Sequence, residues 1–127
     1  MNHGISRPPG ESKFQSKSFI ERYVFPDGEL HEVGTVVSLM QQHGIEVRDV
    51  ESLREHYATT LRHWVANLEA NWDEAVAHAG LAKARIWRLY MAASAVNFED
   101  GRTQIHQILA TGSDDGISGM PLRPSFE

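Results

Sequence analysis

The sequence predicts an α/β domain, and three observations support that class. Long stretches between residues 52 and 100 place apolar side chains at the 3.6-residue period of a helix. Two short stretches, residues 45–50 and 103–110, have the alternation or β-branched content of strands. The 127 residues are 41% hydrophobic and 23% charged, which is ordinary for one soluble globular domain. Two strands do not make a stable sheet, so we expect residues 2–6 to add a stub of a third.

The N-terminal third alternates between loop and short apolar segments. Residues 7–18 are polar, and two consecutive prolines followed by glycine end any regular structure there. Residues 19–25 are rich in aromatic and β-branched side chains, so we interpret them as a short strand or an extended anchor. A Pro-Asp-Gly turn closes this segment. Residues 30–43 then follow the helical period, and Gly44 supplies the C-terminal stop.

Residues 50–72 are the most strongly patterned stretch. Ser52 followed by Glu55 has the spacing of a capping box and predicts that a helix begins at Ser52. Tyr57 brings a phenolic hydroxyl into the apolar stripe of that helix, and a buried phenol needs a hydrogen-bond partner. Tyr57 is therefore either a core tyrosine bonded to a nearby carbonyl or a side chain that points into a site. The stripe, at spacings of four, four, three and four, consists of Leu53, Tyr57, Leu61, Trp64 and Leu68.

The remaining elements follow from breaks in the pattern. We expect the long helix to break near residues 71–73, to resume through His78 and to end at Gly80. A further helix should cover residues 81–100, with Gly101 as its cap, before the strand at 103–110. Residues 111–127 are rich in Gly, Ser, Asp and Pro, and we expect a disordered tail after a folded portion of residues 1–110. The predicted buried face of the last helix consists of Ile86, Leu89, Tyr90, Ala93 and Val96.

The composition excludes several classes of protein. The net charge of −5 argues against a nucleic-acid-binding surface. Without cysteine there is no disulfide framework and no thiolate metal site, which fits a reducing compartment. No apolar run approaches the roughly 18 residues of a membrane span. The first residues do not predict a secretory signal peptide.

Motifs for common chemistries are missing from the sequence. Seven histidines occur, but no pair has a recognised metal-ligand spacing, so we predict no metal site. No glycine-rich phosphate loop and no nucleophile turn is found. The larger aromatic residues in the helices fit a core, although an acyl channel would use the same side chains. These residues are Trp64, Trp72, Trp87, Tyr90 and Phe98.

Several blocks together resemble the C-terminal half of the cyclopropane fatty acid synthase and mycolic acid methyltransferase family. They cover about residues 3–110, and their order and spacing make the resemblance specific. The blocks are H-G-I at 3–5, F-I-E-R-Y-V-F-P-D-G-E-L at 19–30, D-V-E-S-L-R-E-H-Y-A-T-T-L-R-H-W at 49–64, W-R-L-Y-M at 87–91, N-F-E-D-G-R at 97–102 and I-H-Q-I-L at 105–109.

The resemblance implies a class I methyltransferase that uses S-adenosylmethionine. Family members methylate the cis double bond of unsaturated acyl chains, commonly on phospholipids, to give a cyclopropane ring or a methyl or methylene branch. In ring-forming members a bound bicarbonate is the base. Carried over to this sequence, it would be held by His3, the backbone of Ile5 and the hydroxyl of Tyr57. Imidazole, amide and phenol groups can each donate a hydrogen bond to such an anion.

The sequence departs from the family in lacking its cofactor half and the upstream Cys and Glu that also hold bicarbonate. The resemblance implies the last three strands of a Rossmann-like class I methyltransferase fold. Residues 2–6 would be the end of strand five and residues 45–50 strand six. Residues 103–110 would be strand seven, which lies antiparallel between the other two.

We therefore expect a fragment, a truncated reading frame or one half of a split enzyme, which binds no cofactor and has little activity alone. The alternative is a non-catalytic α/β module that binds lipid or a partner subunit. We expect a cytoplasmic protein that contacts the membrane surface peripherally. Strand 103–110 would have an unpaired edge, so we also expect a homo-oligomer or pairing with the missing half.

Overall fold

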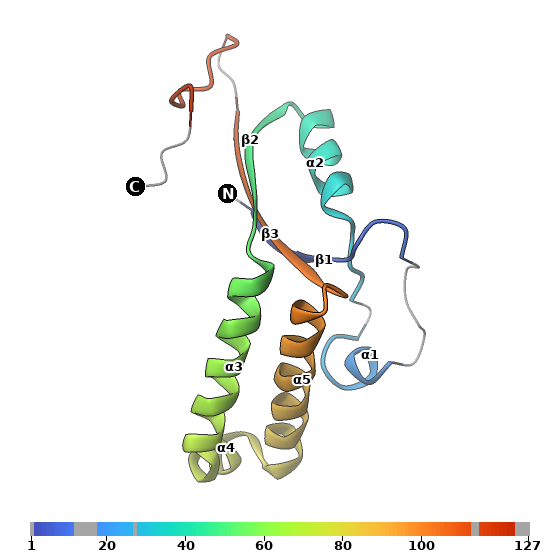
Figure 1. Cartoon of the computed structure of the whole chain (residues 1–127), viewed down its shortest axis with the longest axis vertical. Helices are drawn as coiled ribbons and strands as arrows, with labels where there is room; N and C mark the ends of the chain where they lie inside the picture. Colours follow the sequence, from blue (N-terminus) through green and yellow to red (C-terminus); the bar gives the residue numbers. More distant parts are fainter. Residues whose placement is uncertain (1, 12–17, 27, 113–114, 124–127) are drawn as a thin grey trace.

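A computed structural model describes residues 2–11, 18–26, 28–112 and 115–123, with only the backbone described for Asn2 and His3. Figure 1 shows a small sheet at one end of an elongated molecule and a pair of long helices extending from it. The elements in chain order are β1 (Asn2–Ser6), α1 (Phe19–Tyr23), α2 (Val33–Gln42), β2 (Ile45–Ser52), α3 (Arg54–Ala70), α4 (Trp72–Ala79), α5 (Leu81–Glu99) and β3 (Gln104–Gly112).

The sheet has three strands in the order β1-β3-β2, and both pairings are antiparallel. This confirms the expected arrangement, in which the last strand inserts between the other two. The short first strand is part of the sheet, with Ile5 opposite Ile105. On the other side of β3, Ser52 lies opposite His106. The third strand resolves the shortage of strands that the sequence shows.

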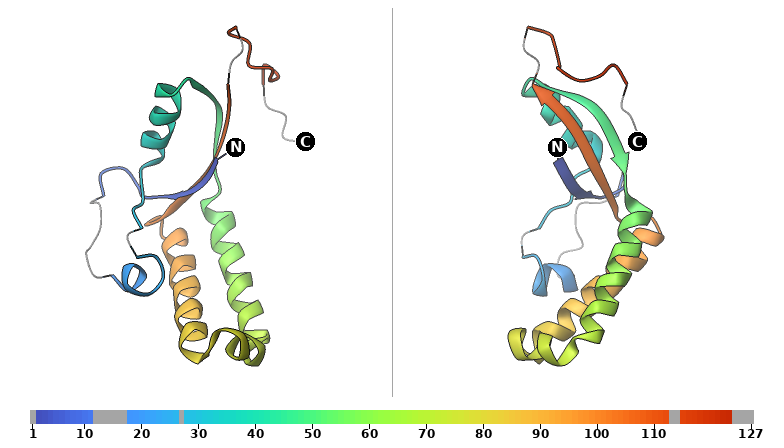
Figure 2. Two further views of the ribbon diagram at one scale, coloured as in Figure 1. Left: turned by 180° about the vertical axis from the view of Figure 1, so that it is seen from behind. Right: turned by 90° about the vertical axis from the view of Figure 1, so that its left-hand side faces the viewer.

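Helices α3 and α5 pack side by side, and α4 connects them at the end far from the sheet (Figure 2). The main buried cluster lies where this helix pair meets β3, so the core joins the helices to the sheet. Its members have at most 9% of their surface exposed, and they are Ala58, Leu61, Met91, Ala95, Phe98 and Ile105.

Arginines on α3 hold the C-terminal end of α5 in place. Arg54 donates to the carbonyl oxygens of Phe98 at 2.5 Å and Glu99 at 2.8 Å. These belong to the last turn of α5, where carbonyl groups have no partner within the helix. Arg62 makes a two-point ion pair with the Glu99 carboxylate, with distances of 2.7 and 2.6 Å. Together these bonds connect the last turn of α5, shortly before β3, to α3.

The predicted capping box at Ser52 is wrong. Ser52 is the last residue of β2, and the next amide, that of Leu53, donates to the carbonyl of Ile105 at 3.0 Å. Pairing with β3 therefore continues to the point where α3 begins, and α3 starts at Arg54 with no side-chain cap. The ladder hydrogen bonds of the sheet outweigh a local preference worth about 1 kcal/mol.

The spacing of a serine followed three residues later by a glutamate also occurs at Ser18 and Glu21, and there it does begin a helix, although we expected a strand or an extended anchor. Ser18 caps α1, and its hydroxyl accepts from the amide of Glu21 at 3.2 Å. The aromatic and β-branched content of residues 19–25 suggested an extended chain, but the same residues include the short helix α1. The expected turn after it includes Asp27, which lies outside the described residues.

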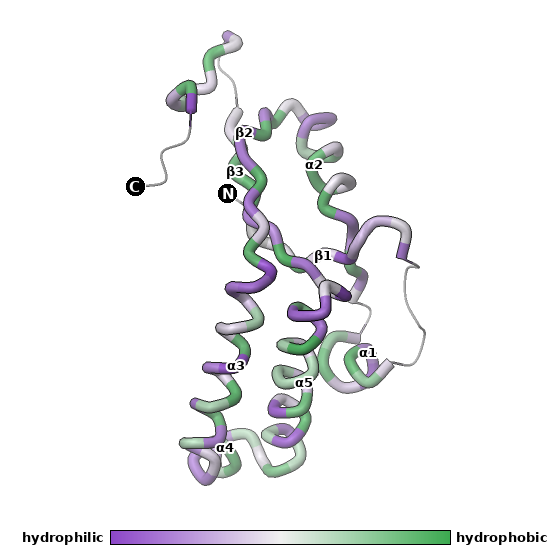
Figure 3. Tube along the Cα trace, viewed as in Figure 1, coloured by the Kyte–Doolittle hydropathy of each residue, from purple (hydrophilic) through white to green (hydrophobic). Residues whose placement is uncertain are grey.

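The predicted buried face of α5 is wrong at three of its five residues, because Leu89, Ala93 and Val96 are exposed, whereas Ile86 and Tyr90 are half-buried. Leu89 is 56% exposed and Val96 is 45% exposed, whereas a neighbouring face is buried. Figure 3 shows apolar residues around much of α5, so the helical period alone could not select the buried side. Two of the five aromatic residues that fitted a core, Trp64 and Trp87, are exposed. The buried residues of α5 are Ala84, Met91, Ser94, Ala95 and Phe98.

Glycines end the helices where the sequence predicts. Gly44 follows α2 with a φ of +76°, and Gly80 separates α4 from α5 with a φ of +82°. A side chain with a Cβ atom is strained at such angles, so each glycine stops its helix. The start of α2 lies three residues after the expected position, at Val33.

The final strand runs two residues beyond the expected domain limit. Thr111 and Gly112 belong to β3, so they are not part of a tail. Further along, Arg48 donates to the carbonyl of Pro121 at 3.3 Å, and Thr111 donates to that of Ser118 at 3.2 Å. Residues 113–114 and 124–127 lie outside the described part, and disorder after residue 112 stays a prediction.

Among the described residues, no helix combines the length and the apolar character needed to cross a membrane.

Candidate functional site: the outer edge of β1 and an apolar cavity

The backbone of Ile5 faces outward from the sheet. The carbonyl of Ile105 accepts from Leu53, so the polar groups of Ile105 point toward β2. Ile5 lies directly opposite Ile105 across β1 and β3. In an antiparallel ladder this makes Ile5 and Ile105 a non-hydrogen-bonded pair. The N–H and C=O groups of Ile5 therefore point to the outer edge of β1.

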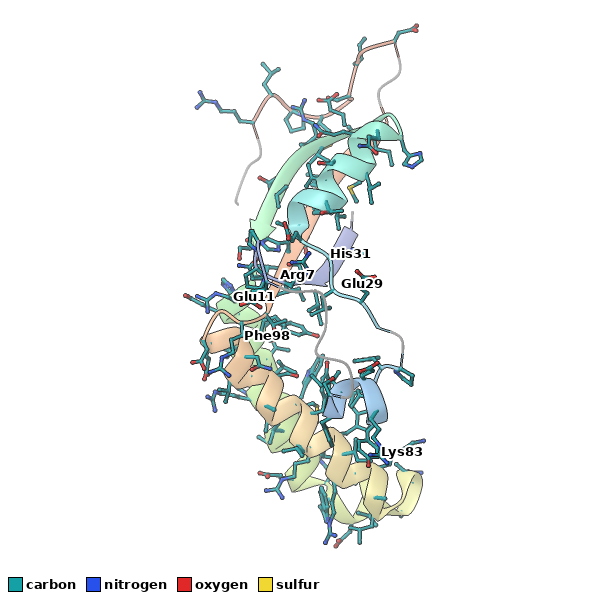
Figure 4. All side chains as sticks on the ribbon, turned by 90° about the vertical axis from the view of Figure 1, so that its right-hand side faces the viewer. Arg7, Glu11, Glu29, His31, Lys83 and Phe98 are labelled. Carbon is teal, nitrogen blue, oxygen red and sulfur yellow. The ribbon has the colours of Figure 1, made fainter. Side chains whose placement is uncertain are left out.

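A hydrogen bond two residues later supports the outward direction of the Ile5 backbone groups, because every second residue of a strand points its N–H and C=O groups to the same side. The amide of Arg7 points to the same outer side and donates to the carbonyl of His31 at 3.2 Å. The Arg7 guanidinium holds the same segment through the carbonyl of Leu30 at 3.1 Å and the carboxylate of Glu32 at 2.8 Å. Figure 4 shows Arg7 beside His31 at this edge. The segment before α2 thus covers the edge at Arg7, immediately after the outward-facing Ile5.

Tyr57 lies on the neighbouring helix α3 with its ring against the core. Its ring makes edge-on contacts with Phe98, at 5.1 Å between centroids, and with Trp64, at 5.8 Å. Burial raises the pKa of Tyr57, and the nearby Tyr90 phenol raises that pKa further. The hydroxyl therefore stays protonated at neutral pH and can donate a hydrogen bond. Its ring packs as a core residue, and its hydroxyl is a possible donor. The structure is therefore compatible with both a core tyrosine and a tyrosine that points into a site.

A cavity of about 260 Å³ lies between β1, α5 and the segment that contains α1. Ile5 contributes the β1 wall, and Tyr90 and Phe98 contribute part of the α5 wall. Most of the surface that lines the cavity is apolar, so it suits a hydrocarbon better than a charged ligand. Its lining residues are Ile5, Ser18, Ile20, Phe25, Gly28, Glu29, Leu30, Tyr90, Ser94, Asn97, Phe98 and Thr103.

Two of the three predicted site residues border the same core cluster. Ile5 and Tyr57 both pack against the core cluster at the junction of sheet and helices. His3 pairs with Gln107 in the sheet, two positions before Ile5, and its side chain lies outside the described residues. The sequence left Tyr90 open between a core and an acyl channel, and it did not identify Ser94 and Asn97 as cavity residues. Tyr90 and Ser94 are four residues apart, which places them on one face of α5.

No group of three or more possible metal ligands of the His, Cys, Asp and Glu types occurs within the described ranges.

Behind β1, on the opposite face of the sheet from Ile5, Ser6 and His106 form a buried polar pair. The Ser6 hydroxyl lies 3.0 Å from Nδ1 of His106, and Ser6 is only 4% exposed. Burial lowers the pKa of His106. The neutral imidazole is therefore the form that fits between β1 and β2, where it helps to hold the short first strand.

This pair predicts a pH dependence of stability. The unfolded chain takes up a proton at His106 below a pH of about 6.5, before the folded chain does. Stability contributed by neutral His106 should therefore be present above that pH and fall as the pH drops toward the lowered folded pKa. Melting curves between about pH 7.5 and pH 5.5 should show a steeper loss in the natural chain than in His106→Gln.

The matched control is His63→Gln, because His63 is exposed on α3. It should leave the pH dependence of the melting temperature unchanged. An identical pH dependence in His106→Gln and the natural chain would contradict the role of this pair.

The fold is part of a class I methyltransferase. It superposes on the crystal structure of mycolic acid cyclopropane synthase CmaA1 complexed with SAH and CTAB, with a TM-score of 0.72 and 27% identity. The superposition covers 85% of this chain and 42% of the solved chain. The helix pair and the inserted antiparallel strand therefore belong to a known enzyme architecture.

The chain belongs to the mycolic acid cyclopropane synthetase family, whose sequence model matches residues 1–108. It is 49% identical over 128 residues to a probable fatty acid methyltransferase of Mycobacterium tuberculosis, covering 100% of this chain and 30% of that protein. A probable fatty acid methyltransferase of Pseudomonas putida is 47% identical over 128 residues, covering 95% of this chain and 32% of that protein. The chain thus spans about a third of the length of these relatives.

Proposed function

We propose that this chain forms the acyl-substrate side of an S-adenosylmethionine-dependent methyltransferase of the cyclopropane synthase type. Its substrates would be unsaturated fatty acyl chains, with phospholipids as their carriers. The observation that carries the proposal is the apolar cavity that Ile5 helps to line. A hydrocarbon in this cavity would reach the strand edge where the Ile5 amide faces outward. The names of the relatives, which refer to fatty acids and mycolic acid, support the same class of substrate.

The cofactor would be bound by other parts of the enzyme. One solved relative is complexed with SAH, the demethylated form of S-adenosylmethionine. The sequence of this chain has no glycine-rich loop after a strand, which is the element that holds such a cofactor in Rossmann-like folds. We therefore expect no binding of S-adenosylmethionine and no methyl transfer by this chain alone.

We also propose a bicarbonate site at the β1 edge, and properties of two of its three proposed ligands support it. The outward Ile5 amide and the protonated Tyr57 hydroxyl are both hydrogen-bond donors, and each contacts the same core cluster. When bound, bicarbonate would supply the base for ring closure. Ile5, Tyr57 and His3 would orient it beside the end of the acyl cavity. The core packing of Ile5 and Tyr57 would keep that position fixed.

Acyl binding can be tested with the chain itself by nuclear magnetic resonance. Palmitoleate, kept below its critical micelle concentration, should shift the methyl signals of Ile5 and Ile20, which line the cavity. Tyr90→Ala should weaken that binding because it removes part of the α5 wall. Leu39 on α2 is exposed and does not line the cavity, so Leu39→Ala serves as the control.

Signals of Ile5 and Ile20 that stay unchanged at saturating palmitoleate would remove the basis of the proposal. Positive binding alone is also expected of a non-catalytic lipid-binding module. Methyl transfer by a completed enzyme separates these two functions.

The expected unpaired edge lies on β1 rather than on β3. Strand β1 covers Gln104 to Ile108 on one side of β3, and β2 covers the other side. Strand β2 protects its own outer edge with charged residues and a bulge between Val47 and Asp49. Strand β1, with the sequence NHGIS, has no fixed charge and pairs only with β3 within the described part of the chain.

We propose that β1 is the strand through which the isolated chain associates, with a second copy or with the rest of the enzyme. Light scattering after size-exclusion chromatography should give a dimer or a higher oligomer of the 14.3 kDa chain at low micromolar concentration. His3→Pro, which removes a backbone donor that faces the outer edge of β1 by the same alternation as that of Ile5, should prevent association if the strand is the interface.

Because a proline in β1 can also disturb its pairing with β3, the circular dichroism spectrum of His3→Pro must match that of the natural chain. A concentration-independent monomer for the natural chain would contradict the association.

A further inference from the structure

Aromatic residues gather on the outer side of the cavity. Phe25 makes edge-on contacts with Trp87 at 6.3 Å and Tyr90 at 5.7 Å, and the Phe19 ring lies 5.4 Å from that of Tyr23. All except Tyr90 have at least a third of their surface exposed. We call Phe19, Tyr23, Phe25 and Trp87 the aromatic rim.

The aromatic rim and the cavity share residues. Phe25 belongs to both, and Trp87 contacts Tyr90, which lines the cavity. Ile20, in the same helix as Phe19 and Tyr23, is also exposed and also lines the cavity. A hydrocarbon that leaves the cavity on this side would therefore pass between exposed aromatic side chains. Tyr and Trp side chains of this kind suit the boundary between lipid headgroups and acyl chains.

Two cations flank the aromatic rim. The Arg22 guanidinium lies 5.2 Å from the centre of the Tyr23 ring. Lys83 is one helical turn before Trp87, and Figure 4 shows it on the α1 side of α5. Neither cation takes part in a salt bridge within the described residues, although six other arginines do. Unpaired cations on a protein with a net charge of −5 favour an anionic partner at this face.

We infer that the aromatic rim docks on an anionic phospholipid bilayer, with its rings among the headgroups and Arg22 and Lys83 against the phosphates. This inference rests on the proposed function and assigns a surface to it. Docking would place the mouth of the cavity at the depth from which an acyl chain can enter. The mixture of exposed aromatic rings, unpaired cations and a continuous apolar cavity fits a bilayer surface better than a folded protein partner.

Docking of the aromatic rim on a bilayer can be tested by sedimentation of the chain with vesicles. Vesicles of phosphatidylglycerol and phosphatidylcholine should bind the natural chain more strongly than vesicles of phosphatidylcholine alone. The double variant Tyr23→Ser and Trp87→Ser should lower the partition coefficient about tenfold or more, because an inserted aromatic side chain is worth at least that factor. Arg22→Gln with Lys83→Gln should remove the preference for anionic vesicles.

Two control variants lie close by on the same helix. Positions two apart on a helix differ by about 200°, so Leu89 lies on the opposite side of α5 from Trp87, and Arg85 lies opposite Lys83. Leu89→Ser and Arg85→Gln should leave vesicle binding unchanged, although Leu89 is more exposed than Trp87.

Absence of vesicle binding, or an equal loss in Leu89→Ser and the rim variant, would overturn the inference. Rim variants that reduce self-association without changing vesicle binding would instead make this face a protein interface. Palmitoleate shifts at Ile5 are read in solution without vesicles, so the proposed function can fail or hold independently of docking.

Discussion

Phe98→Ala should remove a large part of the stability of this chain. Phe98 is 2% exposed and joins the end of α5 to the core beneath β3. It also supports the Tyr57 ring and forms part of the cavity wall. Truncation of a buried phenylalanine to alanine costs about 3–5 kcal/mol, against a total of roughly 5–15 kcal/mol for a typical domain.

The measurement is urea unfolding followed by circular dichroism, with the midpoint and the slope fitted separately. Leu89→Ala, on the exposed side of the same helix, is the control and should cost less than about 1 kcal/mol. A midpoint for Phe98→Ala close to that of Leu89→Ala would show that the core is not centred on Phe98.

Tyr57→Phe should reduce the rate of a completed enzyme without unfolding it. The completed enzyme is a chimera in which this chain replaces the matching part of the Mycobacterium tuberculosis relative, to which it is 49% identical. The ring contacts with Phe98 and Trp64 remain in the variant, and only the hydroxyl is lost. One lost donor to an anion costs roughly 1.5–3 kcal/mol, which is about a tenfold to hundredfold loss in rate.

Trp64→Phe is the control, because it alters the other ring that contacts Tyr57 and keeps the hydroxyl. It should retain most of the rate. Equal turnover by Tyr57→Phe and the unmodified chimera would leave Tyr57 as a core residue only.

The helices and strands were largely predictable because their limits are encoded locally. Gly44 and Gly80 stop helices through backbone angles that other residues avoid, and the sequence shows both. The strand order was predictable only from the family resemblance, since no local pattern tells β3 to insert between β1 and β2. The false cap at Ser52 and the missed cap at Ser18 have the same spacing. Ser52 does not cap a helix because it and Leu53 pair with β3, whereas Ser18 has no such pairing in the described structure.

The candidate site was less predictable because it depends on contacts between distant segments. The outward direction of the Ile5 amide depends on the phase of β1 against β3, which is set about 100 residues away. The cavity draws its walls from β1, the α1 segment and α5, and α5 is apolar on too many sides for its buried face to be deduced. The family resemblance named Ile5 and Tyr57, the aromatic pattern left Tyr90 open between a core and an acyl channel, and no motif pointed to Ser94.

The most direct test of the proposed function is methyl transfer by the chimera, measured by mass spectrometry of its lipid products. With S-adenosylmethionine and monounsaturated phospholipid vesicles, the chimera should add the mass of one CH₂ to the unsaturated acyl chains and none to saturated ones. This chain without the rest of the enzyme should add none to either. A folded chimera that leaves every acyl chain unchanged, while the unmodified Mycobacterium tuberculosis relative modifies them, would contradict the assignment of this chain as the acyl-substrate side of the enzyme.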